Sequence, residues 1–362
     1  MNLRTLVPAL LVTLIFAVGC KKDESPPPTV EWDQTPYALI IGQLPPPVIA
    51  ADNALTQQGV KLGRMLFYEK KLSKDNSMAC ASCHRQEHAF SDTNQFSIGV
   101  DGLPGGRQAM AVFNMAWNTN EYFWDGRAHL LRDQSLIPIQ DPLEMHETLP
   151  NVVAKLKEVQ EYKDQFKRAF GSEEITSEKM SLAMEQFMNS IVSVNNKFDK
   201  VQRGEATLTP SEERGRRLFF TEYNQFFPDS SGADCAHCHS TRTFENDLYM
   251  NNGLDAGQDI TDLGRENVTG NPMDRGKMKV TSLRNIELTP PYMHDGRFNT
   301  LEEVVEHYNS GIKPSPSLDP ALANTMGTGL FLDAQDKADL VAFLKTLTDT
   351  DLMTNPDYSD PN

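Results

Sequence analysis

The chain has 362 residues, of which 39% are hydrophobic and 23% charged, and its formal net charge is −16. This composition is that of a folded protein with one large or two ordinary domains, and excludes a disordered chain. The acidic excess, without a run of Lys or Arg, argues against binding to nucleic acid or to anionic lipid headgroups. Most of the remaining information lies in five cysteines.

The chain begins with an apolar leader. The run from Leu6 to Val18 is too short to cross roughly 30 Å of hydrocarbon, so residues 1–20 are expected to be a signal peptide. The end of the leader, with Cys20, resembles the processing site of a bacterial lipoprotein; an ordinary leader with an incidental cysteine is the alternative. The Pro-rich residues 21–52 predict a stiff tether. We expect a periplasmic protein that is lipid-anchored at Cys20 to a bacterial membrane, with the outer membrane favoured.

Two C-x-x-C-H motifs follow, CASCH at Cys80 to His84 and CAHCH at Cys235 to His239. This is the attachment signature of c-type haem, since Cys80 and Cys83 can reach both vinyl groups of one porphyrin and His84 then lies under the iron. A four-cysteine zinc site and a disulfide pair are competing interpretations. Neither needs a histidine directly after the second cysteine. We therefore expect two covalently bound haems, with the proximal ligands His84 and His239 and the attachment cysteines Cys80, Cys83, Cys235 and Cys238.

The haem motifs belong to a longer internal repeat. A Gly-Arg pair at Gly63 and at Gly215 precedes each motif, and Asp-Gly-Arg follows at Asp125 and at Asp295. The repeat predicts two haem domains related by duplication, over residues 53–200 and 201–350.

The expected fold class is mainly α, with long loops and few strands. Apolar residues at helical spacing between Met180 and Ile191, behind Thr176, predict an amphipathic helix with a Met-rich buried face. Capping boxes begin at Thr209 and Thr300, and residues 333–347 predict a terminal helix. The last segment, residues 351–362, is expected to be a loose polar tail.

From about Ala51 to Leu347 the chain resembles the bacterial di-haem cytochrome c peroxidase and MauG superfamily. The resemblance is carried by several motifs in the family's order: LGRMLF, CASCH, FWDGR, QDPLEM, CAHCH and the stretch from LRN to TPPYMHDG. By this resemblance the N-terminal haem is the peroxide site, with Gln134 and Glu144 over its distal face. Glu144 can carry a proton between the two peroxide oxygens, and a solvated loop acid is the alternative. Trp124 matches the residue that relays electrons between the haems, or it is core packing.

Typical relatives place a removable histidine ligand where this chain has Val100, which cannot bind iron. The first haem is therefore expected to be open in the oxidised enzyme. His88, His129 and His146 are reserve candidates for the sixth ligand, although His88 is too close in sequence to the proximal ligand to reach the opposite face readily.

At the second haem, Tyr308 stands where typical relatives have Met, and this tyrosine resembles the MauG branch. A phenolate ligand favours ferric and higher iron and lowers the potential. His307 could ligate instead, but its side chain diverges from that of Tyr308 by about 100° on a helix; plain packing of Tyr308 is the third alternative. His294 mirrors Trp124 in the second repeat and is expected to form structural or interhaem hydrogen bonds.

The family also holds a calcium ion between its haem domains. The matching positions here are Gln108 and the carbonyls of Thr289 and Pro291, with Gln108 longer than the usual Asn.

The sequence therefore predicts a di-haem peroxidase that reduces hydrogen peroxide with electrons from a cytochrome, a cupredoxin or another small redox protein. One alternative is a MauG-like oxidase, which would oxidise a protein or an organic substrate from a high-valent state. A non-catalytic electron carrier is a third, and Val100 and Glu144 argue against it. A homodimer is compatible with the resemblance.

Overall fold

The computed structural model describes Met1 and residues 29–361, so Cys20 and nearly all of the predicted signal peptide lie outside the described residues. The chain divides into a short N-terminal unit that ends at Val30 and a second unit from Glu31 to the C-terminus. The fold and the site described below lie within the second unit. In the described part of the chain, no helix combines the length and the apolar character needed to cross a bilayer.

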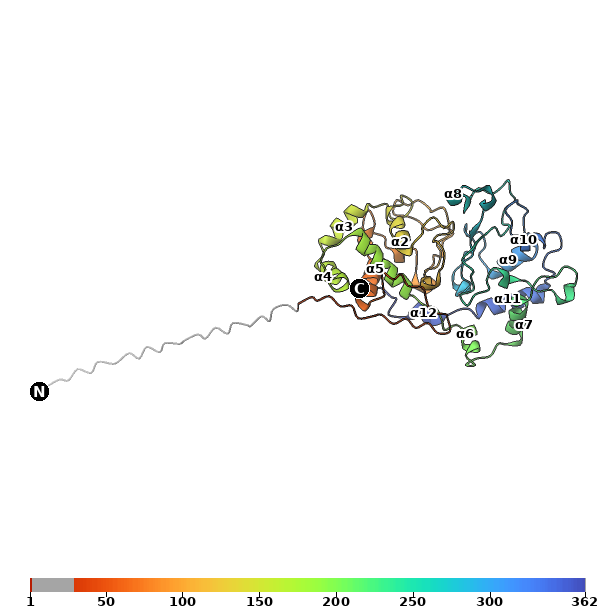
Figure 1. Ribbon diagram of the computed structural model, residues 1–362, viewed down its shortest axis with the longest axis horizontal. Helices are drawn as coiled ribbons and strands as arrows, with labels where there is room; N and C mark the ends of the chain where they lie inside the picture. The colour runs from red at the N-terminus through yellow and green to blue at the C-terminus, as the bar shows by residue number, and fades with distance from the viewer. Residues whose placement is uncertain (2–28, 362) are drawn as a thin grey trace. The chain divides into compact units, whose positions relative to one another are not determined.

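The second unit is mainly helical, which confirms the expected fold class (Figure 1). In chain order, its helices begin with α1 (Gln57–Phe67), α2 (Leu131–Gln140), α3 (Leu149–Lys157), α4 (Gln160–Phe170), α5 (Ser177–Ser190) and α6 (Lys197–Gln202). They are followed by α7 (Pro210–Phe220), α8 (Glu266–Thr269), α9 (Leu301–Glu306), α10 (Pro320–Ala323), α11 (Ala334–Lys345) and α12 (Thr350–Thr354). Two short antiparallel strands, β1 (Tyr249–Met250) and β2 (Met278–Lys279), pair Tyr249 with Lys279.

In the first repeat, α1 packs closely against α5. A Cβ on Gly63 would lie 2.0 Å from the carbonyl oxygen of Ala183, so only glycine allows this approach. Helix α5 begins as predicted, with the Thr176 side chain accepting from the backbone N–H of Lys179. Met180 and Met184 on its inner face are buried, which confirms that the methionine stripe is core.

The second repeat has an equivalent close helix crossing at a glycine. Helices α7 and α11 pack together, and a Cβ on Gly215 would lie 1.9 Å from the carbonyl oxygen of Asp339. The predicted capping boxes at Thr209 and Thr300 are both formed, and Asp333 caps α11. Each Gly-Arg motif of the sequence repeat therefore marks a close helix crossing in front of a haem motif.

The two larger hydrophobic clusters lie within the second unit. The first gathers residues between Val60 and Ile191 together with Leu352 and Tyr358, and the second gathers residues between Phe219 and Leu347. The predicted domain boundary between residues 200 and 201 falls in α6, between these clusters, and stays a prediction.

The predicted tether needs correction over residues 31–52, because this segment packs against the first repeat. Trp32 Nε1 donates to the carbonyl oxygen of Ala169, and the carbonyl oxygen of Pro45 accepts from Trp117 Nε1 at 2.7 Å. Leu44 is buried beside Trp117. Apolar residues between the prolines pack against the first repeat and fix this segment in place. The Pro-rich composition makes these contacts difficult to predict from the sequence.

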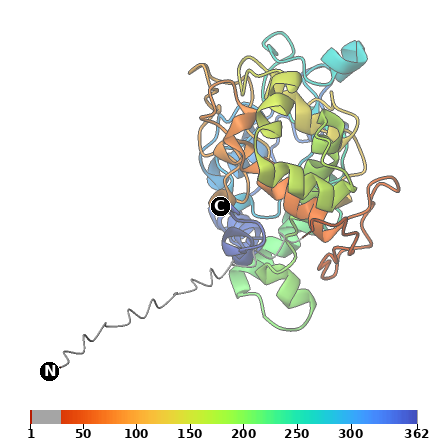
Figure 2. The same cartoon turned by 90° about the vertical axis from the view of Figure 1, so that its left-hand side faces the viewer.

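The expectation of a loose tail is also wrong. Helix α12 packs on the single helical turn Gln86–His88 that follows the first haem motif, and Leu352 and Tyr358 are buried in the first hydrophobic cluster. Gln86 Nε2 donates to the carbonyl oxygens of Leu352 and Asn355. The C-terminal residues accordingly lie beside the helices of the first repeat in both views (Figure 1, Figure 2).

Candidate functional site

A cavity of about 640 Å³ is lined by both repeats. Cys83 and His84 border it from the first repeat, and Cys235, Cys238 and His239 border it from the second. Cys80 begins the same helical turn as Cys83 and packs against the first hydrophobic cluster. The two C-x-x-C-H segments, 155 residues apart in sequence (235 − 80), therefore open into one continuous space.

The two histidines of the motifs are held in the same way. Nδ1 of His84 donates to the carbonyl oxygen of Phe90 at 3.1 Å, and Nδ1 of His239 donates to that of Phe244 at 2.8 Å. Both phenylalanines have a φ of 59°, an uncommon conformation for a side chain of this size. Because Nδ1 carries the proton, Nε2 is left as the nitrogen that can bind iron.

The ligand chemistry of the cavity fits covalent haem. Burial lowers the pKa of His84, and lowers that of His239 to about 4, so both rings stay neutral and able to coordinate a metal. The four cysteines form no disulfide, and within residues 29–361 no group of three or more His, Cys, Asp or Glu side chains could hold a metal ion. The geometry thus gives no support to the zinc and disulfide interpretations.

The side chains of Gln134 and Glu144 border the cavity in the first repeat, as the resemblance implies. Gln134 extends from α2, and Glu144 lies in the loop after it. Burial raises the pKa of Glu144 to about 7; Asp141 adds to the shift and Arg127 opposes it. A carboxyl group with this pKa can both accept and return a proton near neutral pH.

Val100, on which the predicted open face depends, lies in a loop beside the cavity and is absent from its described lining. The backbone N–H of Val100 donates to the carbonyl oxygen of Glu144 at 2.8 Å, and Gly99 lies so close to Leu143 that a Cβ would meet its carbonyl oxygen at 2.1 Å. The loop that could have carried a ligand is therefore fastened to the loop of Glu144. Its residues Ile98 and Gly99 border the cavity.

The structure does not support the reserve histidines as ligands. His88, His129 and His146 are absent from the described lining of the cavity. His129 is exposed, and His146 pairs with Asp101 at the surface. His88 lies in the turn under α12, which is fixed by the C-terminal segment.

Tyr308 and His307 point to different surroundings. Both lie in a wide helical turn, His307–Gly311, of the π type that often occurs at functional sites. Tyr308 borders the cavity, whereas His307 is buried with its Nε2 donating to the carbonyl oxygen of Asn252 at 3.0 Å. Asn252 Nδ2 also donates to Tyr308 Oη at 3.4 Å, and burial raises the pKa of Tyr308 to about 12. Of the two candidate ligands, Tyr308 is the one that the fold directs into the cavity.

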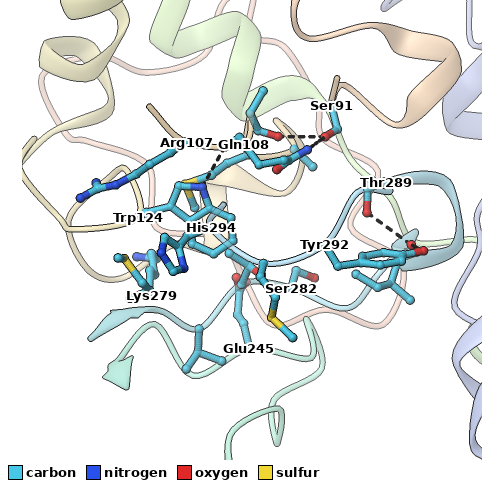
Figure 3. A pocket seen from close by; sticks show the side chains of 18 of the residues that line it. Ser91, Arg107, Gln108, Trp124, Glu245, Lys279, Ser282, Thr289, Tyr292 and His294 are labelled. Atoms are coloured by element: carbon cyan, nitrogen blue, oxygen red, sulfur yellow. Dashed lines mark hydrogen bonds between the residues drawn. The ribbon is translucent and has the colours of Figure 1, made fainter. Parts of the chain in front are cut away.

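Trp124 and His294 lie side by side and both border the cavity (Figure 3). Their rings are 6.5 Å apart in an edge-on arrangement. Trp124 Nε1 donates to the carbonyl oxygen of Gln108, whose backbone N–H donates to the carbonyl oxygen of His294. Trp124 is thus fixed at the junction of the repeats, where an interhaem relay would have to stand.

The three positions matched to calcium all border the cavity. Gln108 is buried and its Nε2 donates to Ser91 Oγ and to the carbonyl oxygen of Asp92, while Thr289 and Pro291 come from the second repeat. Figure 3 places Gln108 beside Ser91 and Trp124, with Thr289 next to Tyr292. Calcium binding itself stays a prediction.

Several charged groups at this cavity have no signal in the sequence. Arg107 joins the repeats by ion pairs with Asp125 and Asp262, both at 2.7 Å. Glu245 borders the cavity in the second repeat, where burial raises its pKa to about 7. Lys279 borders it as well, paired with the buried Asp247. No motif marks these residues, because loops distant in sequence bring them together.

Known proteins share both the sequence and the fold. The profile of the family described as di-haem cytochrome c peroxidase matches residues 57–207. The methylamine utilization protein MauG of Methylorubrum extorquens is 36% identical over 299 residues, which cover 82% of this chain and 79% of that protein. Cytochrome c551 peroxidase of Nitrosomonas europaea is 35% identical over 297 residues, which cover 80% of this chain and 79% of that protein.

A solved structure of a MauG-like protein associated with microbial copper homeostasis superposes with a TM-score of 0.79 at 34% identity, covering 90% of this chain and 99% of that one. The similarity extends over both repeats and includes both C-x-x-C-H segments. The chain therefore belongs to the di-haem cytochrome c peroxidase family, and it is an oxidoreductase with two c-type haems.

Proposed function

We propose that this enzyme reduces hydrogen peroxide to water at the haem of His84, with electrons that enter at the haem of His239 and pass by Trp124. The observation that supports the proposal best is the asymmetry of the cavity. Each repeat presents a carboxyl group whose pKa burial raises to about 7, Glu144 in the first and Glu245 in the second, but the second also presents the phenol of Tyr308, the candidate axial ligand.

When bound, the two haems would carry the donor's electrons and supply the redox-active iron. The protein's part at the first site is proton transfer. In its carboxylate form Glu144 accepts the proton of one peroxide oxygen and returns it to the other, so that water leaves instead of hydroxide. The overall reaction consumes two electrons and two protons and yields two waters. Gln134 borders the same space and can orient the peroxide through its side-chain amide.

Trp124 provides the path between the repeats. Its indole is held by the Gln108 carbonyl and lies against His294, so it cannot rotate away from the junction. Fixed aromatic rings suit electron transfer because the donor and acceptor distances stay constant.

The experiment that tests this function is steady-state turnover of hydrogen peroxide with a panel of reduced cytochromes and cupredoxins. We expect at least one donor to be oxidised in a 2:1 ratio to peroxide. Peroxide consumption without oxidation of any redox protein would contradict the peroxidase assignment.

The second candidate is a MauG-like oxidase of a protein or an organic substrate, and Tyr308 is the observation that favours it. If Tyr308 Oη is the second axial ligand, Tyr308→Met should raise the potential of that haem, by on the order of 0.1–0.3 V within the roughly 0.8 V range that axial ligands command. The variant should also turn over faster with a reduced cytochrome. A Tyr308→Met enzyme with unchanged spectrum and potential would show that Tyr308 is packing, and would remove the reason for this candidate.

For location, the leader sequence supports a periplasmic protein anchored through lipid at Cys20. Mass spectrometry of the mature N-terminus, with Cys20→Ser as the control, tests the anchor.

A calcium ion at Gln108, Thr289 and Pro291 is supported by their shared cavity, and metal analysis before and after chelation tests it. Sedimentation of the holoenzyme tests the predicted homodimer.

A further inference from the structure

The duplicated Asp-Gly-Arg motifs have diverged at their arginines. In the second repeat, Arg297 is held by two carboxylates, with ion pairs of 2.8 Å to Asp255 and 2.6 Å to Asp295, and it also donates to the carbonyl oxygen of Leu254. Its charge is fully matched, and it is absent from the described lining of the cavity.

Arg127, the equivalent residue in the first repeat, has weaker partners. Its ion pair with Asp125 measures 3.2 Å, and Asp125 makes a shorter pair, of 2.7 Å, with Arg107. The guanidinium instead lies over the ring of Phe123, 3.6 Å from its centre. Arg127 is therefore less fully matched by carboxylates than Arg297, and its side chain, which is 37% exposed, borders the cavity.

This charge is placed where peroxide must react. Phe123, Gln134 and Glu144 border the same cavity as Arg127. Of the charged groups that act on Glu144, Asp141 disfavours its ionised form and Arg127 favours it. An anion near Glu144 would therefore be favoured by the guanidinium of Arg127.

We propose that Arg127, together with Phe123, Gln134 and Glu144, forms a subsite for small monovalent anions, and that the hydroperoxide anion is the anion it serves during turnover. This inference rests on the proposed function only in placing the reactive haem at His84. In the step concerned, the Glu144 carboxylate takes a proton from hydrogen peroxide and becomes the neutral acid. The negative charge moves to the peroxide oxygen, where the guanidinium of Arg127 stabilises it by a charge-assisted interaction.

The test is a titration of the oxidised holoenzyme with azide, an anion, and with nitric oxide, a neutral ligand, both followed in the haem absorption spectrum. Arg127→Gln should weaken azide binding by about tenfold, the factor that corresponds to roughly 1.4 kcal/mol, and should leave nitric oxide binding unchanged. Arg127→Lys should retain most of the azide affinity.

A matched control is Arg217→Gln, which removes the same charge from an exposed position on α7 paired with Glu213. Azide binding should not change in this variant. If Arg127→Gln does not accumulate, Arg127→Met keeps a long stem on Phe123 without the charge and allows the same comparison.

Azide affinity that is equal in wild type and Arg127→Gln would overturn the subsite, and so would a parallel loss of nitric oxide affinity, which indicates a damaged pocket. Failure of the proposed function would look different. Azide binding would then depend on Arg127, yet no redox protein would support peroxide turnover.

Discussion

The two repeats share a scaffold and differ in what they present to the cavity. Both have a helix crossing through glycine, a histidine fixed by a phenylalanine carbonyl, and an Asp-Gly-Arg turn in which the glycine has a positive φ, 74° at Gly126 and 62° at Gly296. The first repeat presents Glu144 and Arg127, and the second presents Glu245, Lys279 and Tyr308. Duplication therefore preserved the parts that hold a haem, while the loops and the turn after α9 diverged into the parts that decide its chemistry.

Among the changes that test this difference between the repeats, Glu144→Gln should have the largest effect. The amide is nearly isosteric with the carboxyl group but cannot accept a proton, so reaction with peroxide should slow by about 10²–10⁴-fold. Stopped-flow mixing with peroxide measures the rate, and the spectrum of the second haem is the internal control. An unchanged rate would remove Glu144 from the mechanism and make the two repeats functionally alike.

Leu352 of the C-terminal segment is buried in the hydrophobic cluster of the first repeat, so Leu352→Ala should affect the repeats unequally. Removing this buried side chain should lower the free energy of unfolding by about 2–5 kcal/mol. Thermal unfolding followed in the absorption of both haems would report the loss, with the surroundings of the first haem changing at the lower temperature. Met326→Ala, at an exposed side chain of the second repeat, is the control and should change little.

The glycine crossings should respond equally in the two repeats. In Gly63→Ala and in Gly215→Ala the new methyl group meets a backbone carbonyl, which neighbouring side chains cannot relieve. We expect each variant to lose about 1–3 kcal/mol of stability, more than the roughly 1 kcal/mol that alanine contributes to a helix interior. Denaturant titration of the two variants measures this, and a large loss in only one would show that the crossings are not equivalent.

The smallest of these effects is the pH dependence of the wild-type enzyme. Glu144 must be ionised to accept a proton, and burial raises its pKa to about 7. The second-order rate with peroxide should therefore rise about tenfold per pH unit below pH 7 and level off above it. The Glu144→Gln enzyme should lack this transition, and a profile with its midpoint near the ordinary value of 4.5 would show that the carboxyl group is solvated.

The parts of this structure that depend on the spacing of neighbouring residues can be predicted from the sequence. The haem motifs, the Thr176 and Thr209 caps and the methionine face of α5 require only a few neighbouring residues, so their pattern was sufficient. The prediction was wrong for residues 31–52 and for the segment after Asp349, where polar composition and prolines obscure a few anchoring residues such as Trp32 and Leu352.

The residues of the candidate site likewise fall into those that sequence motifs identify and those that only the structure reveals. Glu144, Gln134, Trp124 and Tyr308 could be placed because the family's motif order carries them, and each borders the cavity. Glu245, Lys279 and Asp262 could not, because their positions depend on how loops of the two repeats meet. The role inferred for Arg127 also required the structure, since its sequence motif is identical to that of Arg297.

The C-terminal segment packs against the first repeat, and this packing has a consequence for biogenesis. A ribosome delivers the first haem motif some 270 residues before Leu352 and Tyr358, which complete the hydrophobic cluster beside it (352 − 80 = 272). Until these two residues are present, the first repeat lacks part of its hydrophobic cluster. The cluster of the second repeat draws on residues up to Leu347 and does not need the segment that follows. A chain shortened before Leu352 should therefore lose support in the first repeat while the cluster of the second repeat stays complete.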